Sequence, residues 1–302
     1  MSSISLSNGL ASVMALFRKF DGLTKRKIDL SSWWNSSANT NERSANGKVY
    51  IIGAGPGDPE LLTMKAHRLL QNADVVLFDW LVSEELLNLA PRNAIRQFVG
   101  KRCGQHSCPQ EMICNLMVQH ASFGRNVVRL KGGDPSVFGR VSEECQALQA
   151  ADIPFAIVPG ITAATGMAAY TGMPLTDRRF AQSVRLITAS LKHPDAEPEW
   201  QNMVAQDAQK QDTLVFYMGL KKVSKIVARL RQHNMPPDTA IALVDQACLP
   251  TQQVLSGTLA NIEQRLLEAN LAGPALIIVG ETARQSFSVA AELLSHQHTT
   301  IR

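Results

Sequence analysis

Long apolar runs are scarce in this chain of 302 residues, and so is charge of one sign. No stretch approaches the roughly 20 uninterrupted apolar residues that span a bilayer, and the richest run, residues 275–279, has the length of a strand. We therefore expect no contact with a membrane. The formal charge is only +4, and no Lys/Arg stripe typical of a nucleic-acid groove is present. A small anionic substrate fits this balance better than nucleic acid does.

Cysteine is also sparse, and the five cysteines are odd in number: Cys103, Cys108, Cys114, Cys145 and Cys248. This usage favours reduced thiols, and hence a cytoplasmic protein, over a disulfide framework. His106 lies among the first three cysteines, but no Cys-x-x-Cys pair exists. We therefore expect no metal site.

The first 47 residues differ in composition from the rest. They are rich in Ser and Asn, and they hold a short apolar piece at residues 10–17 and a basic run at residues 25–27. Because the first twenty residues carry no acid, a targeting peptide is one interpretation. The apolar piece is weak as a signal sequence and lacks a convincing cleavage site, so a flexible N-terminal extension is the favoured one.

From residue 49 onward, short β-branched runs alternate with segments of helical period. Buried strands are predicted at residues 49–52, 75–78, 127–130 and 155–158, with helices at residues 61–70 and 112–123. Such alternation implies an α/β fold with a largely parallel sheet flanked by helices.

A second series of predicted elements begins beyond the stretch at residues 177–180. It comprises strands at residues 184–188, 213–217, 240–244 and 275–279, and helices at residues 222–230 and 262–267. The economical interpretation is two α/β domains, at residues 48–176 and 177–285, followed by a tail at 286–302. We expect an active-site cleft between the domains, since ligands favour domain interfaces and the carboxyl ends of parallel strands.

A glycine-rich turn, Gly53-x-Gly55-x-Gly57-Asp58, follows the first predicted strand. A dinucleotide fingerprint needs glycine at the sixth position, where this chain has Asp58, and no Gly-Lys-Ser/Thr of a phosphate-binding loop follows. Taken alone, the pattern is equally well explained as a tight turn without a ligand.

Two further glycine turns follow predicted strands, at residues 131–135 and 158–163. Because the carboxyl ends of parallel strands meet at one edge of a sheet, the three turns are expected to converge on one crevice. Their backbone groups can bind an adenine or an amino-acid moiety there. Gly219, after the strand at residues 213–217, is expected to add a wall from the second domain.

In these turns and in several other segments, the sequence resembles the uroporphyrinogen-III C-methyltransferases, within the wider class of tetrapyrrole methylases. The matching segments, in order, are residues 49–63 (VYIIGAGPGDPELLT), 78–83 (FDWLVS), 99–102 (VGKR), 128–135 (VRLKGGDP), 158–163 (VPGITA) and 216–220 (FYMGL). With their spacing, these segments cover about residues 49–281.

The resemblance implies a two-domain fold, a homodimer, and S-adenosylmethionine held between the domains without a metal. It also implies methylation of uroporphyrinogen III at C2 and C7, through precorrin-1, to precorrin-2, which feeds the sirohaem, cobalamin and haem d1 routes. The oxidase and chelatase portion fused in some sirohaem synthases is absent, so those activities are expected elsewhere.

The resemblance also assigns roles to residues. The positions implied to bind the methyl donor are Pro56, Gly132, Gly133, Asp134, Thr162, Ala163, Met218 and Gly219. Asp79, Lys101 and Arg140 are implied to be catalytic, and Lys101, Arg140 and His106 to contact the substrate.

Chemistry gives these assignments a rationale. A pyrrole carbon must be aligned with the sulfonium methyl and must lose a proton, for which Asp79 is the candidate base. The acetates and propionates of the substrate require cations, of which Arg140 and Lys101 are the best candidates. Met218 is predicted to pack against the donor, although Met at a strand end is more often part of a core.

Other basic residues add to the positive field near the expected site. They are Arg129, Lys131, Arg178 and Arg179, and each alone is better explained as a solvated surface charge.

Several positions depart from the family's pattern. Trp80 stands where Arg is frequent, Val141-Ser142 where two glycines are common, and Asp177 where His is usual. Loss of a cation and gain of an acid near an anionic substrate are expected either to weaken substrate binding or to alter which intermediate is released. Two rival hypotheses remain: a later precorrin methyltransferase, and a catalytically silent protein that binds the donor or delivers a tetrapyrrole. An active first-step enzyme is favoured because Asp79, Lys101, Arg140 and the glycine turns are all present.

Overall fold

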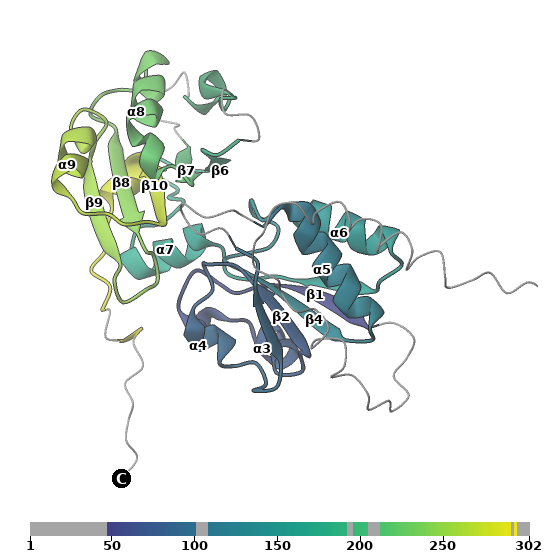
Figure 1. Ribbon diagram of the computed structural model, residues 1–302. Helices are drawn as coiled ribbons and strands as arrows, with labels where there is room; N and C mark the ends of the chain where they lie inside the picture. Colours follow the sequence, from purple (N-terminus) through teal and green to yellow (C-terminus); the bar gives the residue numbers. More distant parts are fainter. Residues whose placement is uncertain (1–46, 101–107, 192–195, 205–211, 291–292, 295–302) are drawn as a thin grey trace, which may run out of the picture. The chain divides into compact units, whose positions relative to one another are not determined.

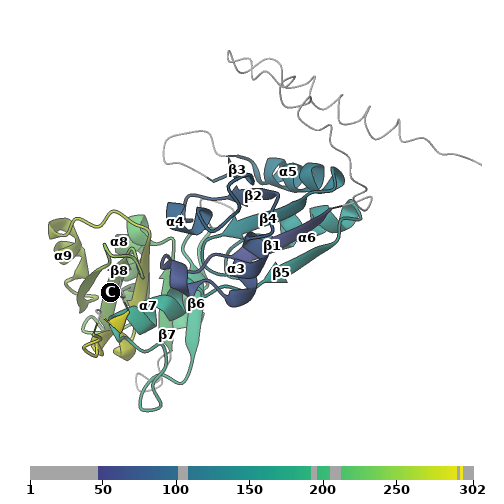
Figure 2. The same cartoon turned by 90° about the horizontal axis from the view of Figure 1, so that it is seen from below.

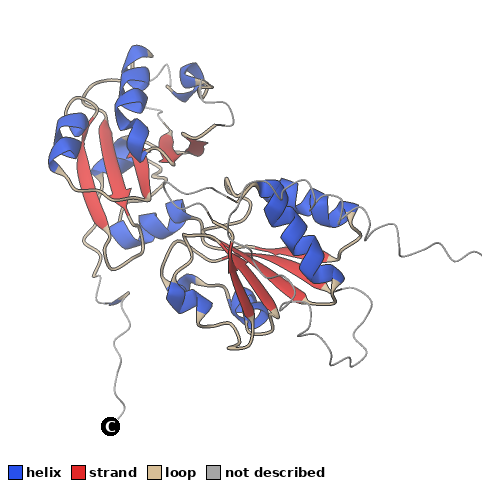
Figure 3. Ribbon diagram, viewed as in Figure 1, coloured by secondary structure: helices blue, strands red, loops and turns tan. Residues whose placement is uncertain are grey.

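The computed structural model describes residues 47–100, 108–191, 196–204, 212–290 and 293–294, and these residues contain two five-stranded sheets with flanking helices (Figures 1 and 3). The predicted α/β class is confirmed. Nearly all of the predicted extension at 1–47 lies outside the described residues, as does most of the predicted tail at 286–302. Within the described part, no helix is long and apolar enough to cross a membrane.

The first sheet is parallel throughout and has the strand order β3-β2-β4-β1-β5. Its strands are β1 (Lys48–Gly53), β2 (Val75–Phe78), β3 (Ile95–Phe98), β4 (Asn126–Lys131) and β5 (Phe155–Val158). The three central strands β2, β4 and β1 are largely buried on both faces, which is why each contains consecutive apolar residues rather than a strict apolar–polar alternation. Four of the five strands fall where the sequence predicts them.

Helices cover both faces of this sheet. On one face pack α3 (Met64–Leu70) and α4 (Glu84–Leu87), and on the other α5 (Gln110–Ser122) and α6 (Val141–Ala150). Figure 2 gives a second view of these layers. The sheet therefore has a hydrophobic core on each side.

The start of α3 differs from the prediction of one helix over residues 61–70. Pro59–Leu61 forms a separate 3₁₀ turn, η1, and the Oδ1 atom of Asp58 accepts the amide of Glu60 at 2.8 Å. The helix itself begins after Thr63, whose Oγ1 accepts the amide of Ala66 at 3.2 Å. The polar caps, rather than the apolar periodicity, set the beginning of α3.

The second sheet is mixed and has the order β6-β7-β10-β8-β9, in which only β6 and β7 are parallel. Its strands are β6 (Val184–Thr188), β7 (Thr213–Tyr217), β8 (Ala240–Asp245), β9 (Gln253–Thr258) and β10 (Ala275–Val279). The sequence does not predict β9 or, in the first sheet, β3. Both are edge strands with largely exposed or alternating side chains, so neither has the apolar run of a buried strand.

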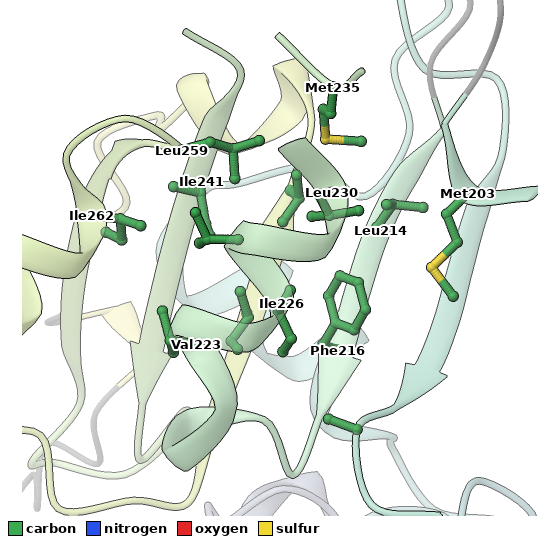
Figure 4. Packing of buried hydrophobic residues seen from close by; sticks show 14 of the residues in the cluster. Met203, Leu214, Phe216, Val223, Ile226, Leu230, Met235, Ile241, Leu259 and Ile262 are labelled. Carbon is green, nitrogen blue, oxygen red and sulfur yellow. The ribbon is translucent and has the colours of Figure 1, made fainter. Parts of the chain in front are cut away.

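One face of the second sheet packs against α8 (Val223–Gln232) and α9 (Ile262–Glu268). The 3₁₀ turns η2 (Trp200–Met203) and η4 (Leu220–Lys222) contribute residues to the same core. Figure 4 shows this core, in which Phe216 of β7 lies near Ile226 of α8. The ring of Phe216 also stacks on Trp200, with centroids 6.0 Å apart. Phe216 is therefore a central element of this core.

The other face of the second sheet packs against α7 (Ala163–Thr171) and the 3₁₀ turn η5 (Glu281–Arg284). Ala164 and Met167 of α7 are fully buried in the same cluster as Val215 and Ile278. The helix that directly follows β5 of the first sheet thus belongs to the core of the second. The division of the chain at residues 176 and 177 remains a prediction.

Truncation of Phe216 tests the importance of this core. We expect Phe216→Ala to lower the free energy of unfolding by about 3 to 5 kcal/mol, because it leaves a cavity in a fully buried cluster. Leu267→Ala is the control, since that side chain is 88% exposed and its loss should change stability by less than about 0.5 kcal/mol. Urea unfolding followed by circular dichroism measures both, and equal losses would contradict this assignment.

Candidate functional site

The three glycine turns meet in direct backbone contact at the carboxyl ends of β1, β4 and β5. Gly55 and Gly133 form an antiparallel bridge, in which Gly133 donates to the Gly55 carbonyl at 2.7 Å and Gly55 donates back at 3.2 Å. The third turn joins them because the Gly160 amide donates to Oδ2 of Asp134 at 3.0 Å. The predicted convergence of the turns is confirmed, whereas their donor-binding role stays a prediction.

Glycine is required where the first and third turns touch. A Cβ atom on Gly53 would lie 2.6 Å from the Cα of Gly160, and one on Gly160 would lie 2.4 Å from the carbonyl oxygen of Gly133. Both distances are shorter than any Cβ contact allows. Gly133 differs, because its φ of +69° requires glycine while its side-chain position meets nothing nearer than 3.9 Å. That open position leaves the backbone between the second and third turns accessible to a ligand.

Asp58 has a structural role that explains why it replaces the sixth glycine. One carboxylate oxygen caps η1, and the other accepts the hydroxyl of Tyr170 in α7. Pro56, in the same turn, lies so close to α7 that a Cβ on Gly166 would be 2.6 Å from it. The first turn is therefore fastened to α7, and Pro56 forms part of that packing.

The hydroxyl of Tyr217, at the end of β7, connects the second sheet to the third turn. It shares a hydrogen bond of 2.7 Å with Oγ1 of Thr162 and accepts the amide of Ala164 at 3.1 Å. Its ring also makes an edge contact with Phe138, with centroids 5.0 Å apart. Burial raises the pKa of Tyr217, so the phenol is neutral at physiological pH. The sequence does not assign this role, although Tyr217 lies within the matching segment at 216–220.

Met218 follows Tyr217 with a left-handed φ of 58°, and its side chain is not part of a core. It is 54% exposed, so the alternative of an ordinary core methionine is wrong. Gly219 is different, since a Cβ there would lie 2.8 Å from Ile277 and 3.1 Å from Ile226. Gly219 thus permits close packing inside the second domain, while Met218 presents an accessible thioether.

Asp79 lies just beyond β2 and faces a buried guanidinium. Its Oδ1 accepts the amide of Leu81 at 3.2 Å, and its Oδ2 lies 3.6 Å from Nη2 of Arg129. The Asp79 side chain is 20% exposed, which leaves it reachable from solvent. The arrangement combines an accessible carboxylate with a cation behind it.

Arg129 and Lys131 are buried, so the interpretation of each as a solvated surface charge is wrong. Both side chains bind Oε1 of Glu144, a residue of α6 with no exposed surface, at 3.2 and 2.9 Å. Gln110 also donates to this oxygen, at 3.2 Å. Burial, followed by the charge of Arg129, lowers the pKa of Lys131, and Glu144 opposes the shift. The sequence gives no sign of Glu144 as a partner, because it lies 13 and more residues away on a helix.

Arg140 precedes α6 with a left-handed φ of 57°, and its side chain is 53% exposed. It binds Glu143 through two hydrogen bonds of 2.8 and 2.7 Å, and this contact raises its pKa. Val141 and Ser142 form the first turn of α6. The other two predicted contacts, Lys101 and His106, lie outside the described residues.

The departure at Asp177 is compensated locally. Arg179 donates to both carboxylate oxygens of Asp177, at 2.9 and 2.7 Å, and lowers the pKa of that carboxyl to about 2. The added acid is therefore ionised and already paired. Arg179, which also donates to Gln285 at 3.2 Å, is committed to this pair.

Among the described residues, no group of three His, Cys, Asp or Glu side chains could hold a metal ion. Four thiols lie in this part of the chain: Cys108, Cys114, Cys145 and Cys248. Burial raises the pKa of each, most strongly for Cys248, to about 12. These thiols are therefore protonated at neutral pH and are poor nucleophiles.

The sequence model of the Tetrapyrrole (Corrin/Porphyrin) Methylases matches residues 48–263. This chain belongs to the tetrapyrrole methylase family. The resemblance seen in the glycine turns and the Asp79 segment is thereby confirmed at the level of the family.

Curated relatives of this tetrapyrrole methylase include siroheme synthases. That of Acinetobacter baylyi is 47% identical over 254 residues, covering 84% of this chain and 55% of the relative. That of Pseudomonas aeruginosa is 50% identical over 240 residues, covering 80% of this chain and 51% of the relative. The chain thus spans about half the length of the curated relatives it matches.

Solved structures with the same two-domain fold include two methyltransferases. The uroporphyrin-III C-methyltransferase of Thermus thermophilus, complexed with S-adenosylhomocysteine, has a TM-score of 0.67 and 37% identity, covering 79% of this chain and 99% of that one. A cobalt precorrin-4 methyltransferase has the same TM-score at 28% identity, and the match covers 78% of this chain and 95% of that one. The two-domain α/β fold predicted from the sequence is confirmed.

The Tyr217 hydroxyl should stabilise the junction between β7 and α7. We expect Tyr217→Phe to lower the free energy of unfolding by about 1 to 3 kcal/mol, because the Ala164 amide and the Thr162 hydroxyl lose their partner. Tyr50→Phe is a matched control, since the Tyr50 hydroxyl has no hydrogen bond within the described part of the chain. Urea unfolding compares the two variants, and equal stabilities would refute the role of Tyr217.

Proposed function

We propose that this chain is a methyltransferase that uses S-adenosylmethionine to methylate uroporphyrinogen III at C2 and C7, giving precorrin-2 through precorrin-1. The observation that carries the proposal is the meeting of three glycine turns near strand ends where Asp79 and buried cations also lie. Membership of the tetrapyrrole methylases and the fold shared with the Thermus thermophilus enzyme support it.

The residues fit the binding of such a donor. Gly133 leaves open space next to Ala163 and Thr162, so the backbone can approach a ligand closely. Met218 offers an exposed, polarizable side chain for the apolar part of the donor. When bound, S-adenosylmethionine supplies an electrophilic methyl group, and we assign its binding to these turns together with Pro56, Gly132, Asp134 and Gly219.

Asp79 is the proposed base. Carbon methylation of a pyrrole requires removal of a proton, and a carboxylate at hydrogen-bonding distance from the ring can accept it. The fixed contact of Oδ1 with the Leu81 amide leaves Oδ2 facing Arg129. The macrocycle would be held by Arg140 and Lys101 through its carboxylates, with His106 as a further contact.

Assembly and location extend the proposal. We propose a homodimer, because edge strands β5 and β6 expose apolar side chains, namely Phe155, Ile157 and Leu186. The reduced state expected of the cysteines is consistent with a cytoplasmic enzyme.

Incubation with uroporphyrinogen III and a labelled methyl donor under anaerobic conditions tests the activity. The expected result is incorporation of two methyl groups per macrocycle. Methylation of a later precorrin alone would instead support the rival suggested by the cobalt precorrin-4 methyltransferase, and no incorporation would support a donor-binding protein without activity.

Asp79→Asn should separate donor binding from catalysis. We expect kcat to fall at least about 100-fold, because the amide cannot accept the proton, while the affinity for S-adenosylhomocysteine measured by calorimetry stays unchanged. Asp152→Asn is the control, since Asp152 lies in a left-handed turn at φ 53°, a conformation that Asn also adopts. Unchanged turnover in Asp79→Asn would remove Asp79 as the base.

Trp80 is expected to determine how strongly substrate binding depends on salt. The side chain is 53% exposed and follows Asp79 in the chain, at a position where the family resemblance implies Arg. Trp80→Arg should lower KM for uroporphyrinogen III about two- to fivefold at low salt and less at high salt, since it adds a screened contact with a carboxylate. Trp80→Leu, which adds no charge, is the control, and the same KM in both variants would contradict the expectation.

A further inference from the structure

A cluster of four charges lies behind the proposed active site. Arg129 and Lys131 supply two cations from β4, Glu144 supplies one anion from α6, and Asp79 supplies the other from the end of β2. Three of the four residues are buried, and only Asp79 reaches solvent. Such charges act strongly on one another because little water screens them.

Glu144 sits at the centre of this cluster. Its Oε1 accepts from Arg129, Lys131 and Gln110, whereas its Oε2 is buried and has no hydrogen-bond partner among the described residues. A buried carboxylate oxygen without a partner destabilises the fold. The interaction of Oε1 with the two cations must therefore offset that cost.

The geometry also fixes the guanidinium of Arg129. Besides the bond from Nε to Glu144, its Nη1 donates to the carbonyls of Leu77 and Leu130 at 3.3 and 2.9 Å. These three contacts leave Nη2 directed at Asp79. Arg129 is thus held between Glu144 on one side and Asp79 on the other.

Counting charges shows what Glu144 does for Asp79. Arg129 faces Asp79 at 3.6 Å and Lys131 interacts with Asp79 electrostatically, while Glu144 binds both cations and cancels one of the two positive charges. Without Glu144, Asp79 would be the one carboxylate among the described residues that pairs with Arg129, and Lys131 would lose its carboxylate partner. Asp79 would then be bound more tightly to the two cations and would be a weaker proton acceptor.

We propose that Glu144 is a positioning residue for the methyl transfer, which holds Arg129 in place and sets the net positive charge behind Asp79. The inference rests on the proposed function, in which Asp79 is the base. Glu144 itself touches neither substrate nor donor, because it has no exposed surface.

The other groups near the cluster do not replace this role. The thiols Cys108, Cys114 and Cys145 have raised pKa values because of burial, so they remain neutral. Arg140 and Glu143, at the beginning of α6, neutralise each other as an exposed pair. The balance that Asp79 experiences within the described residues is therefore set by Arg129, Lys131 and Glu144.

The first test is Glu144→Gln, assayed as kcat/KM against pH with uroporphyrinogen III and a labelled methyl donor. Loss of the anion leaves the charges of Arg129 and Lys131 unbalanced near Asp79, so the acid limb of the profile should move down by about one pH unit and kcat should fall. Affinity for S-adenosylhomocysteine should stay unchanged, since Glu144 is not in the glycine turns.

Two further variants make the test directional. Arg129→Gln removes the cation next to Asp79, so its acid limb should move upward, opposite to that of Glu144→Gln. The double variant Lys131→Gln/Glu144→Gln removes one cation and one anion, which restores the original net charge. Its acid limb should return close to that of the wild type. Because the double variant leaves no extra unpaired charge in the interior, it provides the test even where Glu144→Gln does not fold.

The control is Glu197→Gln. Glu197 also binds two cations, Lys225 at 2.8 Å and Arg229 at 2.7 Å, but these belong to the helix α8 of the second sheet. Its profile should match the wild type.

Acid limbs that move in the same direction in Glu144→Gln and Arg129→Gln, or a double variant that is not restored, would overturn the role of Glu144 alone. A wild-type chain that incorporates no methyl group would instead overturn the proposed function, and with it this inference.

Discussion

The contact between Gly53 and Gly160 is the constraint on which the rest of the site depends. A single added carbon on either residue would collide with the backbone of another turn, so β1, β4 and β5 end at one place only with glycine there. The bridge between Gly55 and Gly133 then fixes the register of the first two turns, and Asp134 attaches the third. Backbone groups thus form the walls of the site, and side chains are free for chemistry.

The same turns determine how the second sheet joins the site. α7 follows the third turn directly and packs in the core of the second sheet. The position of Gly160 therefore determines where α7 enters that core. Tyr217 completes the connection by binding Thr162 and Ala164, and Met218 follows it directly. A left-handed backbone at Met218 is strained for a side chain with a Cβ, and such strain is common at functional positions.

Elements that depend on local sequence could be predicted. Central strands such as β1 contain a run of apolar residues, and the turns after them are rich in glycine, so eight strands and the meeting of the turns follow from the sequence. The edge strands β3 and β9 lack this signal. The burial of Arg129 and Lys131 could not be predicted either, because it depends on Glu144, which α6 brings from another part of the chain. Asp177 and Arg179 are only two residues apart, but their ion pair depends on the turn between them, which the sequence does not predict.

The buried charges are better explained by chemistry than by stability. An ion cluster in a protein interior loses hydration that its internal attraction only partly restores, and apolar side chains of similar size often stabilise a fold equally well. Glu144 adds to this cost, since one of its oxygens has no partner among the described residues. A β4 strand with two apolar residues in place of Arg129 and Lys131 could continue the core around Val127 on the α5 and α6 face of the sheet. It would, however, remove the guanidinium that faces Asp79 at 3.6 Å, and with it the positive charge that the proposed chemistry places beside the carboxylate.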